Sequence, residues 1–444
     1  MNPNFYNISS FYEGASTQLR LERKGLQSNS ETTIAQAEYL HLLRRSQHLY
    51  RNNPIARAIF TVFQTNLRSV DVIWVDKDGV TNNRMQDLWK SFADNPSYDA
   101  YGNLHNIQEN WQNSFMMTGD SFTRLIIEKR TDSKIPLYLQ LIPSINIDPT
   151  YTEQELKIRN SIKFSNGRPS TYFFSKNVES LEVGTRVPIK AERMLHIYKR
   201  LDASAYRGYP LLSPIIIDLY SLADLVDAIT LKQLSASLLS WVIQKPKKSM
   251  APVAPSTTGV EQKVTDNGDK INVSRVTGNQ ALYLESEEEI QLLEGEGIGN
   301  NISDFIKSQL HAIAGAVGLP YEFLTTDVDE VSFSGLKHLA NMMNTTCNYW
   351  HTNYFISLGL MPLCNFFKIL AYQNDRKLKA NLRPSFRMPR PYIVDEFMRA
   401  KADELEVVNG FSTRERKQAD RDVTPEEVKM SESKNKPLKS QEKP

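Results

Sequence analysis

Cysteine is scarce in this chain of 444 residues, which contains only Cys347 and Cys364. Two thiols are too few for the disulfide framework of a small secreted protein or for a cysteine-rich zinc site. The opening residues, MNPNFYNISSFYEGAS, also lack the basic and then apolar pattern of a secretory signal. We therefore expect two free thiols in a reducing compartment, in a protein that stays in the cytoplasm where it is made.

A dominant charge of one sign is also missing. The chain has 53 Lys and Arg residues against 51 Asp and Glu residues, which gives a formal net charge of +2. A protein that grips DNA by itself carries a broad basic surface. Any contact with nucleic acid must therefore be local or weak.

The common sequence motifs of enzyme sites are absent. There is no phosphate-binding Gly-x-x-x-x-Gly-Lys-Ser/Thr loop, no His-Glu-x-x-His metal helix and no Gly-x-Ser-x-Gly nucleophile turn. The stretch GEGIGN, residues 295–300, lacks the third glycine and the βαβ unit of a dinucleotide loop, and a flexible joint before a helix explains it. The seven histidines are scattered, and packing is the expected role of His196, His311 and His338. We predict a protein that is not an enzyme, with no metal and no cofactor.

Apolar residues are abundant enough for a large core, at 40% of the chain with 10% aromatic. Helical spacing runs from Glu31 to Arg68, and Pro54 is well suited to the first turn of a second helix. Between Val70 and Tyr198, short β-rich runs such as VDVIWV, FTRLIIEK and TYFF alternate with turns, and the helical stretch NIQENWQNSFMMTGD crosses them. The sequence therefore predicts the α+β fold class.

The longest periodic stretch begins at Ser213 and Pro214, which we interpret as a helix cap and the first helical position. Its apolar side chains recur every three or four residues: Leu219, Leu222, Val226 and Ile229. We expect this helix to continue to about Ile243. Residues 244–299 then form a Pro- and Ser-rich insertion with strand-like runs such as KINVSRV.

The insertion opens with a basic cluster, Lys245, Lys247 and Lys248. Such a cluster is able to contact phosphate, although a lone cluster is more often a solvated turn. We therefore keep these lysines only as weak candidates for a phosphate contact.

A second helix is predicted from Asn300, with Asn300 or Asn301 as its cap and Asp304 in its first turn. Small residues gather in its last turns: Ala312, Ala314, Gly315 and Ala316. Small side chains allow another backbone to approach closely. Gly318 and Pro320 are expected to end the helix.

A third helix is expected after the acidic loop TTDVDE. Ser332 or Ser334 caps it, and it reaches Leu370 with an interruption near Gly359 and Pro362.

The stretch 354–372 approaches the length of a membrane span, but Asn365 and Lys368 favour a buried or subunit-packing helix. From Ser412 the chain becomes polar, with a short helix plausible up to Val428 and a composition typical of disorder beyond it.

Four stretches together resemble one family, the lambda-type portal proteins of tailed bacteriophages. They are RRSQHLYRNNPIARAIF; SIKFSNGRPSTYFF with RVPIKAERMLHIYKRLDASAYRGYPLLSPIIIDLYSLADL; HAIAGAVGLPYEFLTTDVDEVSFSGLKH; and MPRPYIVDEFMRAKADELEVVNGFSTRERKQADRDVTPEEV. In the family's order, they cover most of the chain from Arg44 to Val428. Each stretch is moderately specific, and the ordered set is strongly so.

The resemblance implies a portal-like subunit with the following parts. They are an N-terminal arm (1–45), an α+β wing (46–211), a first stem helix (212–243), a β-containing clip (244–299), a second stem helix (300–318), a tunnel loop (319–333), a long helix with the return to the wing (334–390), and a small helical crown with a polar tail (391–444). This chain departs from the family pattern in its long Pro- and Ser-rich clip and its short tail.

The resemblance also implies a function. Such proteins form a ring, typically of twelve identical subunits, at one capsid vertex, and the ring is the conduit for packaging and ejection of double-stranded DNA. The expected partners are further copies of the chain, the major capsid or scaffolding protein, the terminase large subunit, a head-tail adaptor and DNA that passes without sequence recognition. The expected location is the virion, with the host cytoplasm during assembly and no membrane attachment.

The requirements of a channel suggest roles for the loop and the small residues. A conduit must not hold DNA, and phosphate contacts by Lys or Arg make binding tight and salt-sensitive. We therefore expect the loop to face the channel, with its acids repelling phosphate and Val331 or Phe333 giving steric contact. The residues concerned are Thr325, Thr326, Asp327, Val328, Asp329, Glu330, Val331, Ser332 and Phe333. A head-to-tail ring also needs two complementary faces, which close-packed helices with small residues supply.

Two alternatives remain open. Asp327, Asp329 and Glu330 could gather a metal ion for phosphoryl transfer, although they lack the spacing of a calcium loop and no second acidic motif accompanies them. The other alternative is a membrane-attached scaffold that uses residues 354–372.

Overall fold

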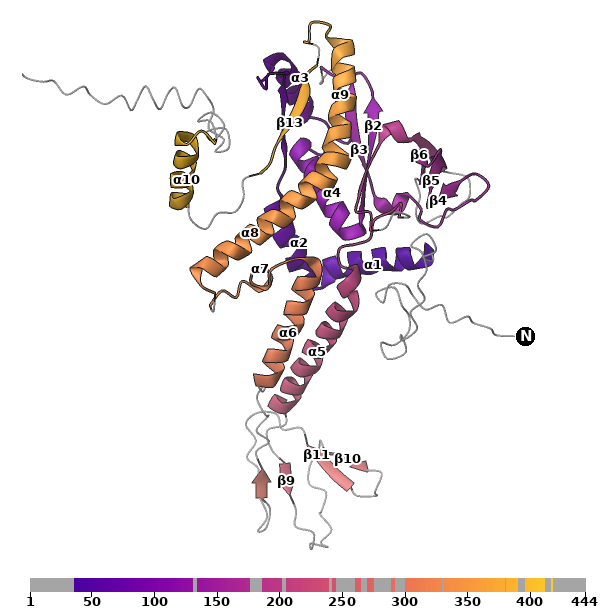
Figure 1. Cartoon of the computed structure of the whole chain (residues 1–444). Coiled ribbons are helices and arrows are strands. Elements are labelled where there is room, and N and C mark those ends of the chain that lie inside the picture. The colour runs from indigo at the N-terminus through magenta and orange to yellow at the C-terminus, as the bar shows by residue number, and fades with distance from the viewer. Residues whose placement is uncertain are drawn as a thin grey trace, which may run out of the picture. The chain divides into compact units, whose positions relative to one another are not determined.

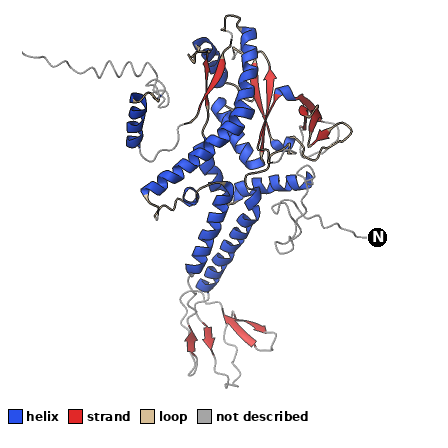
Figure 2. Cartoon of the chain, in the orientation of Figure 1, coloured by secondary structure: helices blue, strands red, loops and turns tan. Residues whose placement is uncertain are grey.

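The structure is a computed structural model whose helices and strands are shown in Figures 1 and 2. The described residues are 36–130, 134–175, 186–201, 205–238, 242–244, 260–264, 270–274, 289–291, 300–329, 331–379, 381–389, 396–411 and 417. The chain divides into two compact units, one made of Met1–Ser221 with Lys307–Pro444 and the other of Leu222–Ile306. Helices and sheets both occur, so the predicted α+β class is confirmed.

Within the residues that the structure describes, the first unit contains three antiparallel sheets. One has the order β3-β2-β8, formed by Leu137–Ile142, Asp120–Ile127 and Met194–Tyr198. The second has the order β4-β5-β6-β7, formed by Ile158–Arg159, Ile162–Ser165, Arg168–Ser175 and Arg186–Lys190. The third pairs β1 (Asp71–Val75) with β13 (Arg383–Arg387), which joins two segments far apart in the sequence.

Four helices precede or separate these strands: α1 (Gln36–Asn52), α2 (Pro54–Leu67), α3 (Asn83–Asp94) and α4 (Leu104–Thr118). The predicted break at Pro54 is confirmed, because Pro54 is the first residue of α2. The side chain of Asn53 caps that helix by accepting hydrogen bonds from the backbone N–H groups of Ile55 and Ala56, at 3.0 and 2.9 Å. Proline costs nothing at this position, since its missing N–H would have no partner there.

The long helix after the acidic loop is a core element. It consists of α8 (Phe333–Trp350), a π-helical segment (His351–Leu360) and α9 (Met361–Asn374). Its apolar length suffices to cross a membrane, but 56% of the relevant window is buried inside the protein. Phe367 is fully buried, with its ring centroid 4.9 Å from that of Trp89 and 5.3 Å from that of Phe92. The predicted buried helix and its interruption near Gly359 are therefore confirmed.

Two helices cross the division between the units, α5 (Ile216–Leu238) and α6 (Asn300–Val317). The second unit also contains two antiparallel strand pairs. These are β9 (Val242–Gln244) with β12 (Glu289–Gln291), and β10 (Val260–Val264) with β11 (Lys270–Ser274).

Three expectations about helix ends are wrong. The first stem helix does not reach Ile243: α5 ends at Leu238, and Ile243 pairs with Ile290 in a strand. Ser213 does not cap a helix, because its hydroxyl donates to the carbonyl of Pro210 at 2.7 Å and it begins a 3₁₀ turn over Ser213–Ile215. Asp304 is the fifth residue of α6, so it lies beyond the first turn.

A buried carboxylate connects several elements of the first unit. Asp120, at the start of β2, is fully buried and accepts hydrogen bonds from Tyr39 of α1 at 2.7 Å and from Arg207 Nε at 2.5 Å. Its other oxygen accepts hydrogen bonds from the His196 ring of β8 at 3.1 Å and from the Gly208 backbone at 2.7 Å. Segments from four parts of the chain are thus fixed around one charge.

Two glycines allow the backbone near residue 208 to come close enough to Asp120 for these hydrogen bonds. Gly119 has a φ of +84°, and a Cβ atom on it would lie 2.4 Å from the backbone of Gly208 and Tyr209. A Cβ atom on Gly208 would lie 2.0 Å from the Gly119 carbonyl oxygen. No larger residue fits where the two backbones cross, so the Gly208 N–H is able to reach Asp120.

The network keeps Asp120 ionised. Burial alone would raise the pKa of its carboxyl, but Arg207, His196 and the Gly208 N–H together lower this pKa to about 2. Burial lowers the pKa of His196, so its ring is neutral at pH 7, with Nε2 donating to Asp120 and Nδ1 facing the Tyr172 hydroxyl at 3.4 Å. Since the folded pKa of Asp120 lies below its ordinary value, its stabilising contribution is complete above pH 4 and is lost as the pH falls through about 2.

We predict that Asp120→Asn lowers the free energy of unfolding by about 3–5 kcal/mol, because it leaves the buried Arg207 guanidinium without its counter-charge. Urea denaturation at pH 7 measures this change. Glu128→Gln is the control, since Glu128 forms a partly exposed ion pair with Arg130 at 3.3 Å, and such pairs contribute about 0–1 kcal/mol. Equal effects of the two substitutions would contradict a central role for Asp120.

Candidate functional site

The loop between α6 and α8 is fixed at both ends. It begins with the short helix α7 (Tyr321–Thr325), which ends at Thr326 in the left-handed conformation with φ of 59°. The Thr326 N–H donates to the Glu322 carbonyl at 2.8 Å. At the other end, the Ser332 hydroxyl caps α8 by accepting a hydrogen bond from the Gly335 N–H at 3.2 Å. Of the two predicted caps, the structure selects Ser332.

The acidic residues of this loop have different surroundings. Asp327 lies 3.7 Å from the Nζ atom of Lys307 on α6, and their side chains are 40% and 42% exposed. An ion pair this exposed contributes about 0–1 kcal/mol to the free energy of unfolding. Asp329 is exposed, and Glu330 lies outside the described residues. Sequence reasoning missed Lys307, which reduces the negative field of Asp327 and for which no local pattern gave a signal.

Two apolar side chains project from the loop region. Val328 is 44% exposed, and Phe333, the first residue of α8, is 58% exposed. Val331 lies against Gly335, since a Cβ atom on that glycine would be 2.9 Å from Val331 Cγ1. Of the two residues expected to give steric contact, Phe333 is therefore the more accessible.

The small residues of α6 fall into two groups. Ala314 is buried, next to the buried side chains of Ile313 and Val317. Ala312, Gly315 and Ala316 are exposed, and a Cβ atom on Gly315 would meet no atom within 4 Å. Within a single chain nothing requires these three to be small. The helix still ends as predicted, with Gly318 at φ of +76° and the Leu319 N–H donating to the Ala314 carbonyl at 2.9 Å.

The remaining candidates are placed as follows. Lys245, Lys247 and Lys248 lie outside the described residues. Within the part of the chain that the structure describes, no group of three or more His, Cys, Asp or Glu side chains is arranged to hold a metal ion. His196 is buried in the carboxylate network, whereas His311 is exposed and stacks on Tyr321 with ring centroids 3.8 Å apart.

Comparison with known proteins gives one family. The family described as phage portal protein, lambda family, matches residues 19–351, which is 333 of the 444 residues. No curated protein matches the sequence.

Solved structures give more distant resemblances. A chain in the neck of a native gene transfer agent particle, computed with C12 symmetry, has 12% identity and a TM-score of 0.47, covering 86% of this chain and 92% of that chain. An HK97-family phage portal protein from Corynebacterium diphtheriae has 11% identity and a TM-score of 0.34, covering 77% of this chain and 94% of that chain.

We predict that Ser332→Ala destabilises the first turn of α8 by about 1 kcal/mol, because the Gly335 N–H loses its acceptor. Amide hydrogen exchange in residues 334–337 should become faster by a corresponding factor. Ser334→Ala is the matched control, since the Ser334 hydroxyl contacts only that of Ser332 among the hydrogen bonds of the described chain. Unchanged exchange in the Ser332 variant would show that the loop is held by other contacts.

Proposed function

Because the chain belongs to the lambda family of phage portal proteins, we propose that identical copies of it close into a ring of twelve, which conducts double-stranded DNA through one capsid vertex. The family match over 333 residues carries this proposal. The same proposal places the protein in the virion and, during assembly, in the host cytoplasm. Its partners would be the major capsid or scaffolding protein, the terminase large subunit and a head-tail adaptor.

The exposed small residues of α6 support a ring. A ring of identical subunits joins two different faces of each copy, and the same contact repeats until the circle closes. Ala312, Gly315 and Ala316 offer a helix face without bulk, which nothing in the described chain covers. A neighbouring backbone is able to approach this face closely, so dense packing between copies becomes possible.

The loop supports a conduit rather than a clamp. Tight DNA binding requires several Lys or Arg contacts to phosphate. The loop carries acids instead, and Lys307 of α6 lies 3.7 Å from Asp327. With Phe333 as a steric contact, residues 325–333 would keep the duplex centred while repelling its phosphates.

Electron microscopy of the purified protein tests the proposal directly. Ring-shaped particles with a central hole are the expected result. Protein that stays monomeric under all solution conditions, and that is missing from the vertex of its virus particle, would rule the function out.

We predict that replacing Asp327, Asp329 and Glu330 by Ala leaves ring assembly intact but slows DNA passage several-fold at low salt. The reason is that the loop loses its repulsion of phosphate, and the difference should shrink as salt screens the charges. Packaging and ejection rates at two salt concentrations measure the effect. Replacing the exposed wing residues Asp78, Asp87 and Glu155 by Ala is the control for the loss of three charges.

Equal rates in the loop variant and the native protein would remove the channel role of these acids. Metal-stimulated cleavage of DNA that is lost in the same variant would instead favour the phosphoryl-transfer alternative.

We predict that Gly315→Leu prevents ring closure while the subunit folds normally. A Cβ atom at position 315 would meet no atom of its own chain within 4 Å, and a helical glycine is itself about 0.5–1 kcal/mol less stable than alanine. Native mass spectrometry reports ring size, and thermal unfolding reports subunit stability. Glu109→Leu adds the same side chain to the exposed surface of α4 and serves as the control. Rings of normal size from the Gly315 variant would contradict the packing role of α6.

A further inference from the structure

An exposed phenylalanine, Phe411, follows the end of the helix α10 (Glu396–Val408), and its backbone is fixed by hydrogen bonds to that helix. The Phe411 N–H donates to the Glu406 carbonyl at 2.9 Å, and the Gly410 N–H donates to the Val407 carbonyl at 3.2 Å, with Gly410 at φ of +74°. These two bonds form a Schellman motif, in which the residue at the position of Phe411 commonly packs back on its own helix. Here the Phe411 side chain is 82% exposed. The motif therefore fixes the backbone from which an exposed aromatic ring projects.

The ring of Phe411 belongs to a larger apolar edge. Val408, the last residue of α10, is 76% exposed and lies three residues before Phe411. Glu404 precedes Val408 by four residues within the helix, so an exposed acidic side chain lies on the same helix face as Val408. Because the two cap bonds fix the backbone, mainly side-chain freedom is lost on binding.

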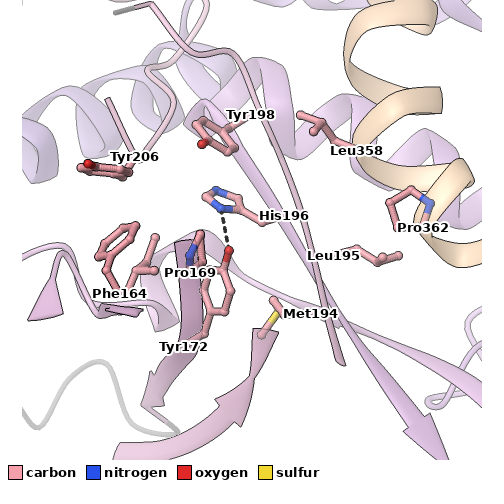
Figure 3. A pocket seen from close by; sticks show the side chains of 11 residues that line it. Phe164, Pro169, Tyr172, Met194, Leu195, His196, Tyr198, Tyr206, Leu358 and Pro362 are labelled. Atoms are coloured by element: carbon pink, nitrogen blue, oxygen red, sulfur yellow. Dashed lines mark hydrogen bonds between the residues drawn. The ribbon is translucent and has the colours of Figure 1, made fainter. Parts of the chain in front are cut away.

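The first unit also contains a pocket of about 180 Å³, which Figure 3 shows from close by. We name it the wing pocket. Its lining includes Phe164, Tyr172, His196, Tyr198, Tyr206 and Pro362. An apolar cavity of about 150 Å³ holds one benzene molecule, so the wing pocket has room for one aromatic ring.

The walls of the wing pocket are already in place. The His196 ring stacks on Tyr198, with centroids 4.2 Å apart, and Tyr172 lies at right angles to His196 at 5.7 Å. At the other side, Phe164 and Tyr206 have centroids 4.4 Å apart. His196 is also anchored by Asp120, so the buried carboxylate network fixes one wall. A ligand side chain would therefore meet a preformed aromatic surface.

The charges of the two surfaces are complementary. Two basic groups lie at one side of the pocket, since the guanidinium groups of Arg159 and Arg200 are 5.9 and 5.8 Å from the centre of the Tyr206 ring. Residues 396–411 contain four acidic and two basic residues, a net charge of −2. Lys417 pairs with Asp403 at 2.8 Å and with Glu406 at 2.5 Å, which leaves the exposed Glu404 beside the apolar edge.

We propose that Phe411 of one copy inserts into the wing pocket of a second copy, with Glu404 facing Arg159 and Arg200; this inference rests on the ring assembly proposed above. The pocket and the helix end are different surfaces of the same chain, so the contact is head-to-tail and repeats around a ring. An aromatic side chain that fills a pocket commonly contributes a large share of the binding free energy of a protein interface. The C-terminal helix thus becomes a clasp between neighbouring subunits.

Cross-linking between two single-cysteine variants tests the contact. Full-length Pro169→Cys and Asn409→Cys proteins, which keep Tyr206 and Phe411 in place, are mixed, assembled and exposed to oxidised glutathione, so that a 169–409 disulfide is able to form only between copies. Pro169 lines the pocket and is exposed, and Asn409 is exposed two residues before Phe411. The native thiols do not interfere, because both are buried, and burial raises the pKa of Cys347 to about 12 and the pKa of Cys364 still further. Tyr101→Cys mixed with Asn409→Cys is the control, since Tyr101 is also exposed but lies outside the pocket.

The expected result is a dimer-sized band whose 169–409 peptide exceeds that of the control mixture at least tenfold. Phe411→Ala should also weaken ring assembly by roughly tenfold or more, as for an interface anchor, whereas Tyr101→Ala should not. A disulfide that forms only when both cysteines are in one chain would overturn the second copy as the occupant.

Electron microscopy of the same samples separates the two proposals. Intact rings without the 169–409 cross-link, and with no effect of Phe411→Ala, would refute the clasp and leave the ring standing. Absence of any oligomer from the native protein would refute both.

Discussion

The packing of the first unit depends on one carboxylate that stays ionised although it is buried. Asp120 is fully buried, and a buried charge is tolerated only when partners replace its lost hydration. Arg207, Tyr39, His196 and the Gly208 N–H are those partners, and they come from a helix, a strand and an irregular segment. Because each partner is itself buried, displacing any one of these segments would leave an unpaired polar group inside the protein.

The residues around Asp120 are held by many buried contacts, whereas the loop after α7 is held by few. His196 belongs both to this network and to the wall of the wing pocket, where its ring stacks on Tyr198. The loop after α7 has no comparable anchor: its ends are capped by backbone and hydroxyl contacts, and its single described ion pair, Lys307–Asp327, is about 40% exposed. The loop is thus held at its ends and only weakly in its middle, which fits the channel role proposed for it above.

Much of the architecture could be predicted because local signals agree with the final structure. Pro54, the Gly318 stop and the apolar long helix each depend on chemistry within a few residues, and each was placed correctly. The end of α5 was wrong because Val242 and Ile243 have the same apolar character in a helix or a strand, and only their pairing with Glu289–Gln291 decides between them.

The contacts of the candidate site also depend on residues that are distant in the sequence, so local patterns predict them only in part. The acids of the loop are visible in the sequence, but the partner Lys307 is twenty residues away and is brought near by the turn through α7. Asp120 and Arg207 looked like ordinary charged residues, because nothing local marks a charge that will be buried 87 residues from its partner.

The crossing of Gly119 and Gly208 has a consequence for the order of events during synthesis. Strand β2 emerges from the ribosome long before residue 208, so Asp120 must remain hydrated until its last partners arrive. Contacts this distant in the chain are formed only after the entropy of closing a long loop has been overcome. The network around Asp120 is therefore completed only after residue 208 has emerged, and a nascent chain stopped before that residue would lack both the Arg207 and the Gly208 partners of this carboxylate.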